Sequence, residues 1–348
     1  MSRERTIFWK SKMGVSRLPV ALAVLIALIT VVATRTLTAT HAASATTSAP
    51  ILYAIHTDRS IWEYDGQNWT EIYSSNSQTA SIVASQTTLY QLQLDGTILV
   101  YTGTPLTGWQ VVDSSKTAAQ ILMSSDGAFY KQHTDASIWK YSSQGSWTQL
   151  SSADGGAGGG YIAAGPGGAL YAIHSSGVYQ YTGVPMTGWQ EIDNTMLNGY
   201  HAAIGLAVTT NGKLYEVRDT EPAGTTSIVS DVWAYNSPNH WTQISWENMD
   251  KLLAGGNGSL YKLGANGLIK VYSGSGINWT TLKSLSQTMN FTVSATNQVF
   301  ALQRSGTTPG EGGATIWMLV GSSWKEISTN LTYEITSTAG GDGVNFVG

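Results

Sequence analysis

Short apolar and aromatic runs alternate with Gly, Asp, Asn and Ser between residues 51 and 348, and one such unit occurs seven times. Each unit opens with an apolar residue followed by Tyr or Phe, continues with a second apolar pair, and then contains a lone tryptophan. The openings are Leu52-Tyr53, Leu89-Tyr90, Phe129-Tyr130, Leu170-Tyr171, Leu214-Tyr215, Leu260-Tyr261 and Val299-Phe300. The tryptophans are Trp69, Trp109, Trp147, Trp189, Trp241, Trp279 and Trp324. No helical period is present after residue 50, so the pattern predicts short strands joined by tight turns.

The first unit shows how the strands are expected to follow one another. Residues 52–56, 61–64 and 69–72 form three strands, and residues 81–84 form the innermost strand of the next unit. Successive tryptophans are 40, 38, 42, 52, 38 and 45 residues apart. A period of about 40 residues built from four short strands predicts an all-β fold, a seven-bladed β-propeller of four-stranded blades.

The two ends of the repeat region are expected to meet. Blade one begins at its second strand, and residues 331–337 follow the last tryptophan as an additional strand. This C-terminal strand is predicted to pair with blade one and close the ring, which protects sheet edges that would otherwise invite aggregation. The propeller domain is therefore assigned to residues 46–348.

Three connections are longer than the repeat requires. Residues 218–226 and 304–313 lengthen the turn between the second and third strands of two units, and residues 194–200 lengthen a connection between units. All three are expected on the same face of the disc. Loops on one face of a rigid scaffold are frequent sites of function, although tolerated insertions explain them equally well.

Residues 1–45 differ in character from the rest. Basic residues precede an apolar run over residues 18–33, and the small residues Ala42 and Ala45 provide cleavage sites. This order is typical of a secretory signal peptide. An uncleaved N-terminal signal anchor is the alternative, and it would be the protein's only connection to a membrane. Either interpretation predicts an extracellular protein, secreted or held at the cell surface.

Charge and cysteine content limit the partners. The full chain has a net charge of −4, and without residues 1–45 it has 12 basic and 21 acidic residues, a net charge of −9. Such a surface repels phosphate backbones, so nucleic acid is not expected as a partner. The chain has no cysteine, which excludes disulfides and cysteine-based zinc sites.

The tryptophans fall into two sets. The fourth-strand tryptophan recurs in every unit, which favours a structural role as a wedge between adjacent blades. A third-strand tryptophan occurs in four units only. Because its position varies between units, packing constrains it less, and an indole there is a candidate for stacking against a sugar ring. These glycan-binding candidates are Trp62, Trp139, Trp233 and Trp317.

A histidine and an aspartate recur at the end of the second strand. The pairs are His56 with Asp58 and His133 with Asp135. In the structural interpretation Asp caps the hairpin turn and His bonds to a neighbouring blade; in the functional one, both contact sugar hydroxyls. The histidines fall on different blades, so they do not predict a shared metal ion.

No motif in the chain indicates catalysis. Gly-x-Ser-x-Gly, His-Glu-x-x-His and phosphate-loop sequences do not occur, and no Trp-Asp dipeptide marks a WD40 repeat. We therefore predict no catalytic residue, metal site or cofactor. An enzyme on this fold would require one deep central pocket with convergent carboxylates and a perturbed pKa.

The repeat resembles that of tectonin and tachylectin-type propeller lectins. The partly matching stretches are Asp95-Gly96-Thr97-Ile98, Asp135-Ala136-Ser137-Ile138-Trp139 and Trp147-Thr148-Gln149-Leu150. The resemblance covers residues 51–348 and implies sugar binding at several equivalent sites, between blades or near their turns. Two units have Arg218 and Gly264 in place of His, so fewer than seven working sites are implied.

The sequence thus predicts an exported, non-catalytic propeller that binds glycans or glycoconjugates at several weak sites, which gain avidity on a surface. A secreted or cell-surface scaffold that binds a protein partner is the main alternative. A propeller hydrolase or lyase is a third.

Overall fold

The computed structural model describes residues 52–74, 78–85, 87–142, 144–152, 161–174, 177–197, 200–221, 228–282, 284–285, 287–304, 314–337 and 344–345. Within these ranges the chain forms β-strands and one short 3-10 turn, η1 (Pro166–Gly168), without an α-helix. Chain contacts separate residues 1–48 from a compact unit of residues 49–348. The described part of the chain has no helix long and apolar enough to span a membrane. The predicted signal segment, residues 1–45, lies outside the described residues.

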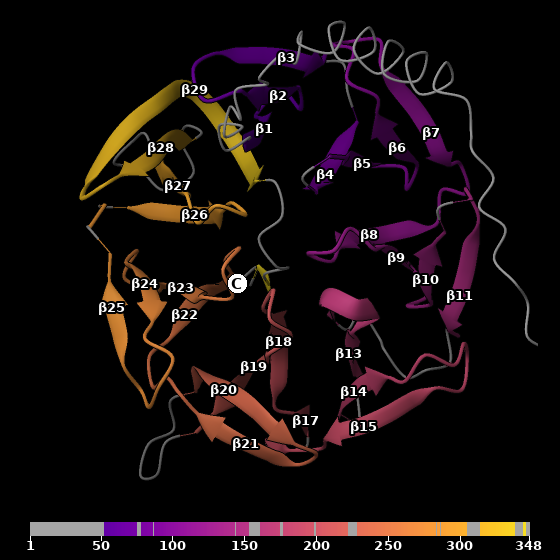
Figure 1. Ribbon diagram of the computed structural model, residues 1–348, viewed down its shortest axis with the longest axis vertical. Coiled ribbons are helices and arrows are strands. Elements are labelled where there is room, and N and C mark those ends of the chain that lie inside the picture. Colours follow the sequence, from indigo (N-terminus) through magenta and orange to yellow (C-terminus); the bar gives the residue numbers. More distant parts are fainter. Residues whose placement is uncertain are drawn as a thin grey trace, which may run out of the picture. The chain divides into compact units, whose positions relative to one another are not determined.

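Five sheets follow the predicted blade plan, in which four consecutive strands pair antiparallel. The first two sheets contain β4 (Thr79–Ala84), β5 (Leu89–Gln93), β6 (Ile98–Tyr101) and β7 (Trp109–Asp113), then β8 (Ala118–Met123), β9 (Phe129–His133), β10 (Ile138–Tyr141) and β11 (Trp147–Ser151). The third contains β12 (Ile162–Ala164), β13 (Leu170–His174), β14 (Gly177–Tyr181) and β15 (Trp189–Asp193). The last two contain β18 (Ala203–Val208), β19 (Leu214–Thr220), β20 (Val229–Ser237) and β21 (His240–Gln243), then β22 (Met249–Ala254), β23 (Leu260–Gly264), β24 (Ile269–Tyr272) and β25 (Trp279–Thr281). The sheets stand around a common centre with their first strands innermost, which confirms the predicted β-propeller fold (Figure 1).

The prediction of seven separate four-stranded blades is wrong, because five are present and seven other strands form one continuous sheet. Those strands are β1 (Leu52–His56), β2 (Ile61–Tyr64), β3 (Trp69–Tyr73), β26 (Thr288–Val293), β27 (Val299–Arg304), β28 (Ala314–Val320) and β29 (Ser323–Ser337). The physical reason is the length of β29. It has 15 residues and neither Gly nor Pro to turn it, so it remains extended and pairs with β28 on one side and β1 on the other.

The C-terminal half of β29 joins the two ends of the ring. Its residues pair antiparallel with β1, from Leu52 opposite Ser337 to His56 opposite Thr332, with a register shift at Tyr333. The inner edge of β22 is paired as well, by the two-residue strand β30 (Val344–Asn345). The first strand of the described chain, β1, is therefore not left as a free edge.

The structure describes only part of the three longer connections. Residues 194–200 contribute to a small hairpin of β16 (Met196–Leu197) and β17 (Tyr200–His201). The first residues of the 218–226 segment extend β19 through Thr220, and residues 222–227 lie outside the described part of the chain. The same is true of residues 305–313 in the other insertion.

The hydrophobic core lies between neighbouring sheets. One cluster joins Ile138 and Leu150 of the β8–β11 sheet to Ile162 and Leu170 of the β12–β15 sheet, and all four are buried. Because both faces of each sheet are covered in this way, the strands are apolar on both sides. The sheets position whatever is bound between them or at the ends of their strands.

The fourth-strand tryptophans attach a repeat unit to the unit before it. In four cases the indole Nε1–H donates to the backbone carbonyl three residues after the preceding tryptophan. The bonds run from Trp69 to Ile327 (2.9 Å), Trp109 to Ile72 (2.7 Å), Trp189 to Leu150 (2.9 Å) and Trp279 to Ile244 (2.6 Å). The structural interpretation of these tryptophans therefore agrees with the geometry. Trp147 and Trp241 differ, since their buried indole N–H groups have no partner.

This difference provides a matched pair of variants. Trp279 and Trp147 have similar surroundings, each with a lysine amine over the ring at 4.6 and 4.4 Å. We expect Trp279→Phe to lower the free energy of unfolding by about 1 kcal/mol more than Trp147→Phe, because only Trp279 loses a hydrogen bond. Chemical denaturation of both variants measures the difference. Equal losses would show that the bond contributes nothing.

Candidate functional site

The predicted histidine and tryptophan residues come together in two equivalent units. His56 stacks on Trp62 with ring centroids 5.2 Å apart and planes at 20°, and His133 stacks on Trp139 at 5.2 Å and 22°. In each unit the histidine ends the second strand of the repeat, which is β1 or β9. The tryptophan is the second residue of the third strand, which is β2 or β10. The two units belong to different sheets, so the candidates do not converge on one site.

A serine connects the tryptophan to the aspartate in both units. The indole of Trp62 donates to Ser60 Oγ at 2.8 Å, and that hydroxyl donates to Asp58 Oδ1 at 2.6 Å. In the second unit the bonds from Trp139 to Ser137 and from Ser137 to Asp135 are 2.9 and 2.7 Å. The aspartates also accept backbone N–H groups of their turns, at 3.0 and 2.9 Å. The structural interpretation of Asp as a turn cap is thus confirmed.

The aspartates stay ionised and accessible. Both side chains are exposed at the turn. Hydrogen bonds from Ser137 lower the pKa of Asp135. Burial opposes the same effect at Asp58, but the bonds from Ser60 outweigh it and that pKa is also lowered. Each unit therefore presents a carboxylate to solvent beside a half-buried indole. We name these the His56–Trp62 unit and the His133–Trp139 unit.

Buried histidine nitrogens without partners are a further feature. The Nε2 atom of His56 and both ring nitrogens of His174 are buried and make no hydrogen bond. His174 lies at the position of His56 in its own sheet, edge-on to Tyr179 at 4.8 Å. A buried polar atom of this kind calls for a water or a ligand group.

Burial lowers the pKa of His56, His133 and His174. The unfolded chain, with ordinary histidines, binds protons more readily than the folded one as the pH falls below about 6.5. We therefore expect these histidines to reduce the free energy of unfolding between about pH 7 and pH 5, and this contribution to be smaller in His174→Gln. Urea denaturation across this range measures it. An unchanged pH dependence in the variant would contradict the assignment.

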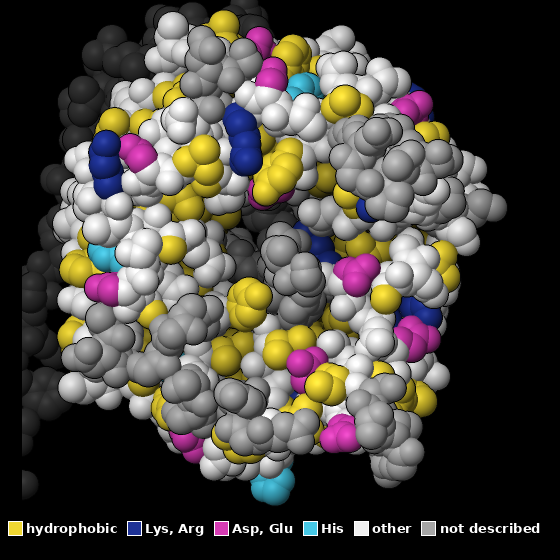
Figure 2. All heavy atoms as spheres, turned by 180° about the vertical axis from the view of Figure 1, so that it is seen from behind, with side chains coloured by type: hydrophobic (Ala, Val, Ile, Leu, Met, Phe, Trp, Pro, Cys, Tyr) yellow, Lys and Arg dark blue, Asp and Glu magenta, His cyan; other side chains and the backbone are white. Residues whose placement is uncertain are grey.

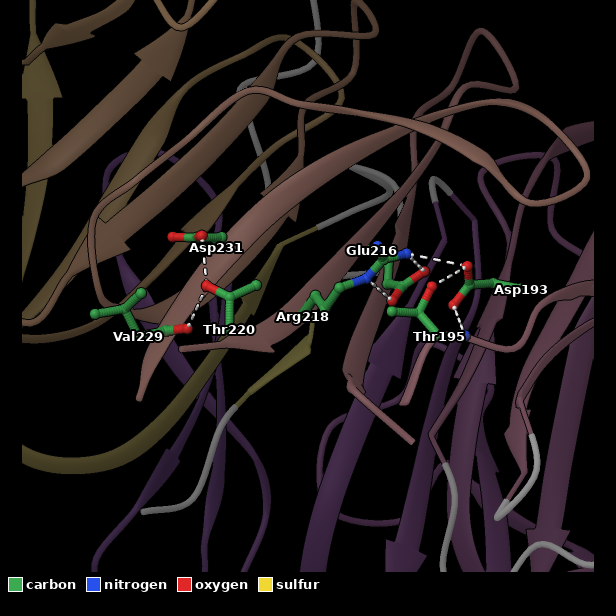
Figure 3. Close-up of polar contacts among 7 residues, drawn as sticks. All are labelled: Asp193, Thr195, Glu216, Arg218, Thr220, Val229 and Asp231. Atoms are coloured by element: carbon green, nitrogen blue, oxygen red, sulfur yellow. Dashed lines mark hydrogen bonds and ion pairs between the residues drawn. The ribbon is translucent and has the colours of Figure 1, made fainter. Parts of the chain in front are cut away.

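Trp233 lies in a different environment from Trp62 and Trp139. Arg218 replaces the histidine, with its guanidinium 4.7 Å from the Trp233 ring centroid. The guanidinium bonds Glu216 at 2.9 and 3.3 Å and forms an ion pair with Asp193 at 3.1 Å. Figure 3 shows Arg218 pointing toward these carboxylates, and the hydroxyl of Thr195 also donates to Asp193. The group is almost completely buried and is occupied by its own contacts.

The indole N–H of Trp233 also differs. The other three third-strand tryptophans each donate to a Ser or Thr two residues earlier, which is Thr315 in the case of Trp317, at 2.8 Å. Here that position is Asp231, whose carboxylate accepts hydrogen bonds from Thr220 and Gln243. Trp233 Nε1 and Asp231 Oδ1 are both buried without a partner. Burial raises the pKa of Asp231.

The sequence analysis missed a set of buried charges in the middle of the second strands. The third residue of this strand is Ala in β1, β13 and β27, but Lys131, Glu216 and Lys262 in β9, β19 and β23. Lys131 pairs with Asp113 of the preceding sheet, and Lys262 with Glu247 at 3.1 Å. Burial would raise the pKa of Asp113, but bonds from Lys131 and Ser115 outweigh it and lower that pKa. The signal was available, as charged residues in otherwise apolar strands.

The Arg218 group allows a direct test of this substitution pattern. Arg218→Ala removes the guanidinium that pairs with the buried carboxylates of Glu216 and Asp193, and we expect a loss of about 3–5 kcal/mol in the free energy of unfolding. The double variant Glu216→Ala with Arg218→His copies the Ala54 and His56 combination of β1. Chemical denaturation should show that it recovers the part of the loss due to Glu216, whereas the ion pair of Asp193 stays broken. A double variant as unstable as the single one would contradict this account.

Repeated pockets lie at the opposite end of the strands from the His56–Trp62 and His133–Trp139 units. One is a hollow of about 380 Å³ between β1–β2 and β5–β6, and the second, about 480 Å³, lies between β5 and β9–β10. The first is lined by Tyr53, Glu63, Thr87, Leu89 and residues 101–103. The second is lined by Tyr90, residues 126–129, residues 140–142 and Gly168. The sequence analysis did not single out these residues.

Exposed apolar side chains are a separate surface feature. Leu94, Ile228 and Trp246 are 58, 52 and 61% exposed, and all lie in turns or connections between strands. On the face drawn in Figure 2, hydrophobic side chains lie around a hollow at the centre of the ring. Among the described residues, no three His, Asp or Glu side chains are grouped to hold a metal ion.

No protein-family model and no curated protein matches the sequence. Solved structures share the fold at low identity. Virginiamycin B lyase from Staphylococcus aureus, in an inactive form with quinupristin, is similar with a TM-score of 0.53 and 14% identity over 74% of this chain and 87% of the lyase. YCF48 bound to D1 peptide has a TM-score of 0.50 and 15% identity over 73% of this chain and 90% of YCF48.

A third similar structure is PorZ, a surface component of the type-IX secretion system of Porphyromonas gingivalis. Its TM-score is 0.50 at 11% identity, and the match covers 73% of this chain and 33% of PorZ. These proteins differ in function, and at such identities they show the propeller fold alone. The resemblance to tectonin propellers therefore rests on the repeat residues.

Proposed function

We propose that the protein is an exported, non-catalytic propeller that binds glycans at several equivalent sites. The observation that carries this proposal is the duplicated geometry of the His56–Trp62 and His133–Trp139 units. Each combines a half-buried indole with an exposed carboxylate and an imidazole. Aromatic rings stack on the C–H faces of sugars, and neighbouring polar groups bond to their hydroxyls.

Several sites on one rigid ring suit a surface partner. Each unit offers few polar groups, so a single sugar is expected to bind weakly. Units held in fixed positions engage a surface together and gain avidity without new contacts. Export follows from the composition of residues 1–45, and an extracellular location is part of the proposal.

A protein partner is the second candidate. The exposed side chains of Leu94, Ile228 and Trp246 favour it, because large apolar groups in projecting turns are common in protein interfaces. YCF48, similar in fold, is known with a bound peptide.

We do not propose catalysis. The central cavity, about 230 Å³, is lined by Lys251 and Glu334. Burial lowers the pKa of Lys251 to about 8 and raises that of Glu334 to about 7. Among the described residues that line it, however, Glu334 is the one carboxylate. The convergent carboxylates expected of a propeller hydrolase or lyase are therefore not found there.

A glycan array tests the proposed function directly. We expect the wild-type protein to bind a restricted set of glycans. The variant Trp62→Ala with Trp139→Ala should lose at least tenfold in apparent affinity, because two of the multivalent contacts are removed. Trp246→Ala, which removes an exposed indole outside the units, is the matched control and should bind normally.

Thermal unfolding of all three proteins establishes that the variants are folded. A wild-type protein that binds no glycan would rule out the proposed function. Loss of binding in Trp246→Ala but not in the double variant would move the contact surface to the exposed turns.

A further inference from the structure

Two tyrosine-lined pockets between adjacent sheets have the same construction. In each pocket, one tyrosine is the second residue of the second strand of its unit. It faces another tyrosine, which ends the third strand of the next sheet. The pairs are Tyr53 with Tyr101 and Tyr90 with Tyr141. We name these the Tyr101 pocket and the Tyr141 pocket. They lie at the opposite strand ends from the His56–Trp62 and His133–Trp139 units, since Tyr53 is near the start of β1 and His56 ends it.

The tyrosine hydroxyls in these pockets are available to a ligand. No hydrogen bond joins the hydroxyl of Tyr53, Tyr101, Tyr90 or Tyr141 to another described residue, in contrast to equivalent tyrosines elsewhere. Tyr64 and Tyr272 donate to the carbonyls of Gly66 and Gly276 in their own turns, at 2.8 and 2.9 Å. Burial raises the pKa of Tyr53, Tyr90 and Tyr101, so these hydroxyls stay protonated and can donate.

Each pocket combines aromatic walls with a charged group from a third strand, but the two charges lie on different walls. Glu63 of the Tyr101 pocket comes from the sheet of Tyr53, whereas Lys140 of the Tyr141 pocket comes from the sheet of Tyr141. Asp126 also lines the Tyr141 pocket, where its carboxylate accepts hydrogen bonds from Ser124 and from the backbone N–H of Gly167. The Tyr90 ring stacks on Phe129 at 3.9 Å, which holds the wall of the second pocket rigid. Rigid aromatic walls with a few convergent polar groups are the usual construction of a small-molecule site.

Size separates these pockets from the central cavity. Their volumes of about 380 and 480 Å³ lie within the range of ligand sites, roughly 300–1,000 Å³. The central cavity, at about 230 Å³, is smaller. The pockets are shallow and open, which suits a single ring at the end of a chain.

We infer that the Tyr101 and Tyr141 pockets are a second class of sugar site, each taking one neutral pyranose residue. The inference deepens the proposed glycan binding and rests on it. The apolar face of the pyranose packs on the tyrosine rings, and its hydroxyls bond the free phenols. Glu63 accepts hydrogen bonds from hydroxyls in one pocket and Lys140 donates hydrogen bonds in the other, so the two pockets differ in preferred sugar.

The two site classes lie at opposite strand ends, hence on opposite faces of the ring. A propeller with sugar sites on both faces can join two glycan-bearing surfaces, which sites on one face cannot do.

The test uses the full chain and the methyl glycosides of glucose, galactose, mannose and N-acetylglucosamine. Binding is measured by protein-detected NMR titration, which places each contact on the chain. We expect at least one glycoside to shift resonances of residues 101–103 or 140–142. Tyr101→Leu should remove the first set of shifts only, and Tyr141→Leu the second only, with at least a tenfold loss of affinity at the altered pocket.

Tyr272→Leu is the matched control, because that tyrosine ends a third strand but donates to its own turn. It should bind as the wild type does. Retention of the shifts in the double variant Tyr101→Leu with Tyr141→Leu would overturn the inference, as would equal losses in the control.

The outcome separates the inference from the proposed function. Glycan-array binding with unaltered tyrosine-pocket resonances would leave the proposed function standing and refute the second class of site. An array without any bound glycan, together with no shifts from the glycosides, would refute both.

Discussion

The attachment of each sheet to the one before it is the interaction on which the rest of the structure depends. A single sheet of this kind is apolar on both faces and cannot be stable alone, so its stability comes from its neighbours. The fourth-strand tryptophan combines the two requirements, because its ring fills the space between sheets and its N–H bonds a backbone carbonyl across that space. The bond needs a defined distance and angle, which fixes how one sheet is turned against the next. Whatever lies between sheets is positioned by it.

Two fourth-strand tryptophans depart from this arrangement. Trp147 and Trp241 lack the bond, and these are the indoles approached by Lys131 and Arg218. Each cation pairs with an aspartate of the preceding sheet, Asp113 or Asp193. An ion pair between sheets thus accompanies the tryptophan in these places, at the cost of desolvating two charges. At Trp279 the two kinds of contact occur together, because Lys262 lies over its ring and pairs with Glu247 while the indole N–H bonds Ile244.

The ends of the strands, rather than their middles, are available for binding. In second strands such as β1 and β13 every residue is buried by core contacts. At one end, the His56–Trp62 and His133–Trp139 units keep a carboxylate in solvent; at the other, the tyrosine pockets keep free hydroxyls. In the His–Trp units several polar groups already bond to one another. The hydroxyls of Ser60 and Ser137 each accept a hydrogen bond from the indole N–H and donate one to the aspartate. The hydroxyls in the tyrosine pockets make no such bonds to described residues, so they remain available to a sugar.

The sequence by itself determined the strands, the turns and the propeller, because a local alternation of apolar and turn residues repeated at a fixed interval reports local geometry. It also identified the Asp caps and the structural tryptophans, whose contacts lie within a few residues or recur in each repeat. The tertiary structure alone decided the number of separate blades, since whether β29 turns or runs on depends on its partners on both sides. It alone revealed the tyrosine pockets and the buried ion pairs, which join residues of different sheets. Local patterns contain no information on which side chains of two neighbouring sheets face one another, and that facing is what makes a site.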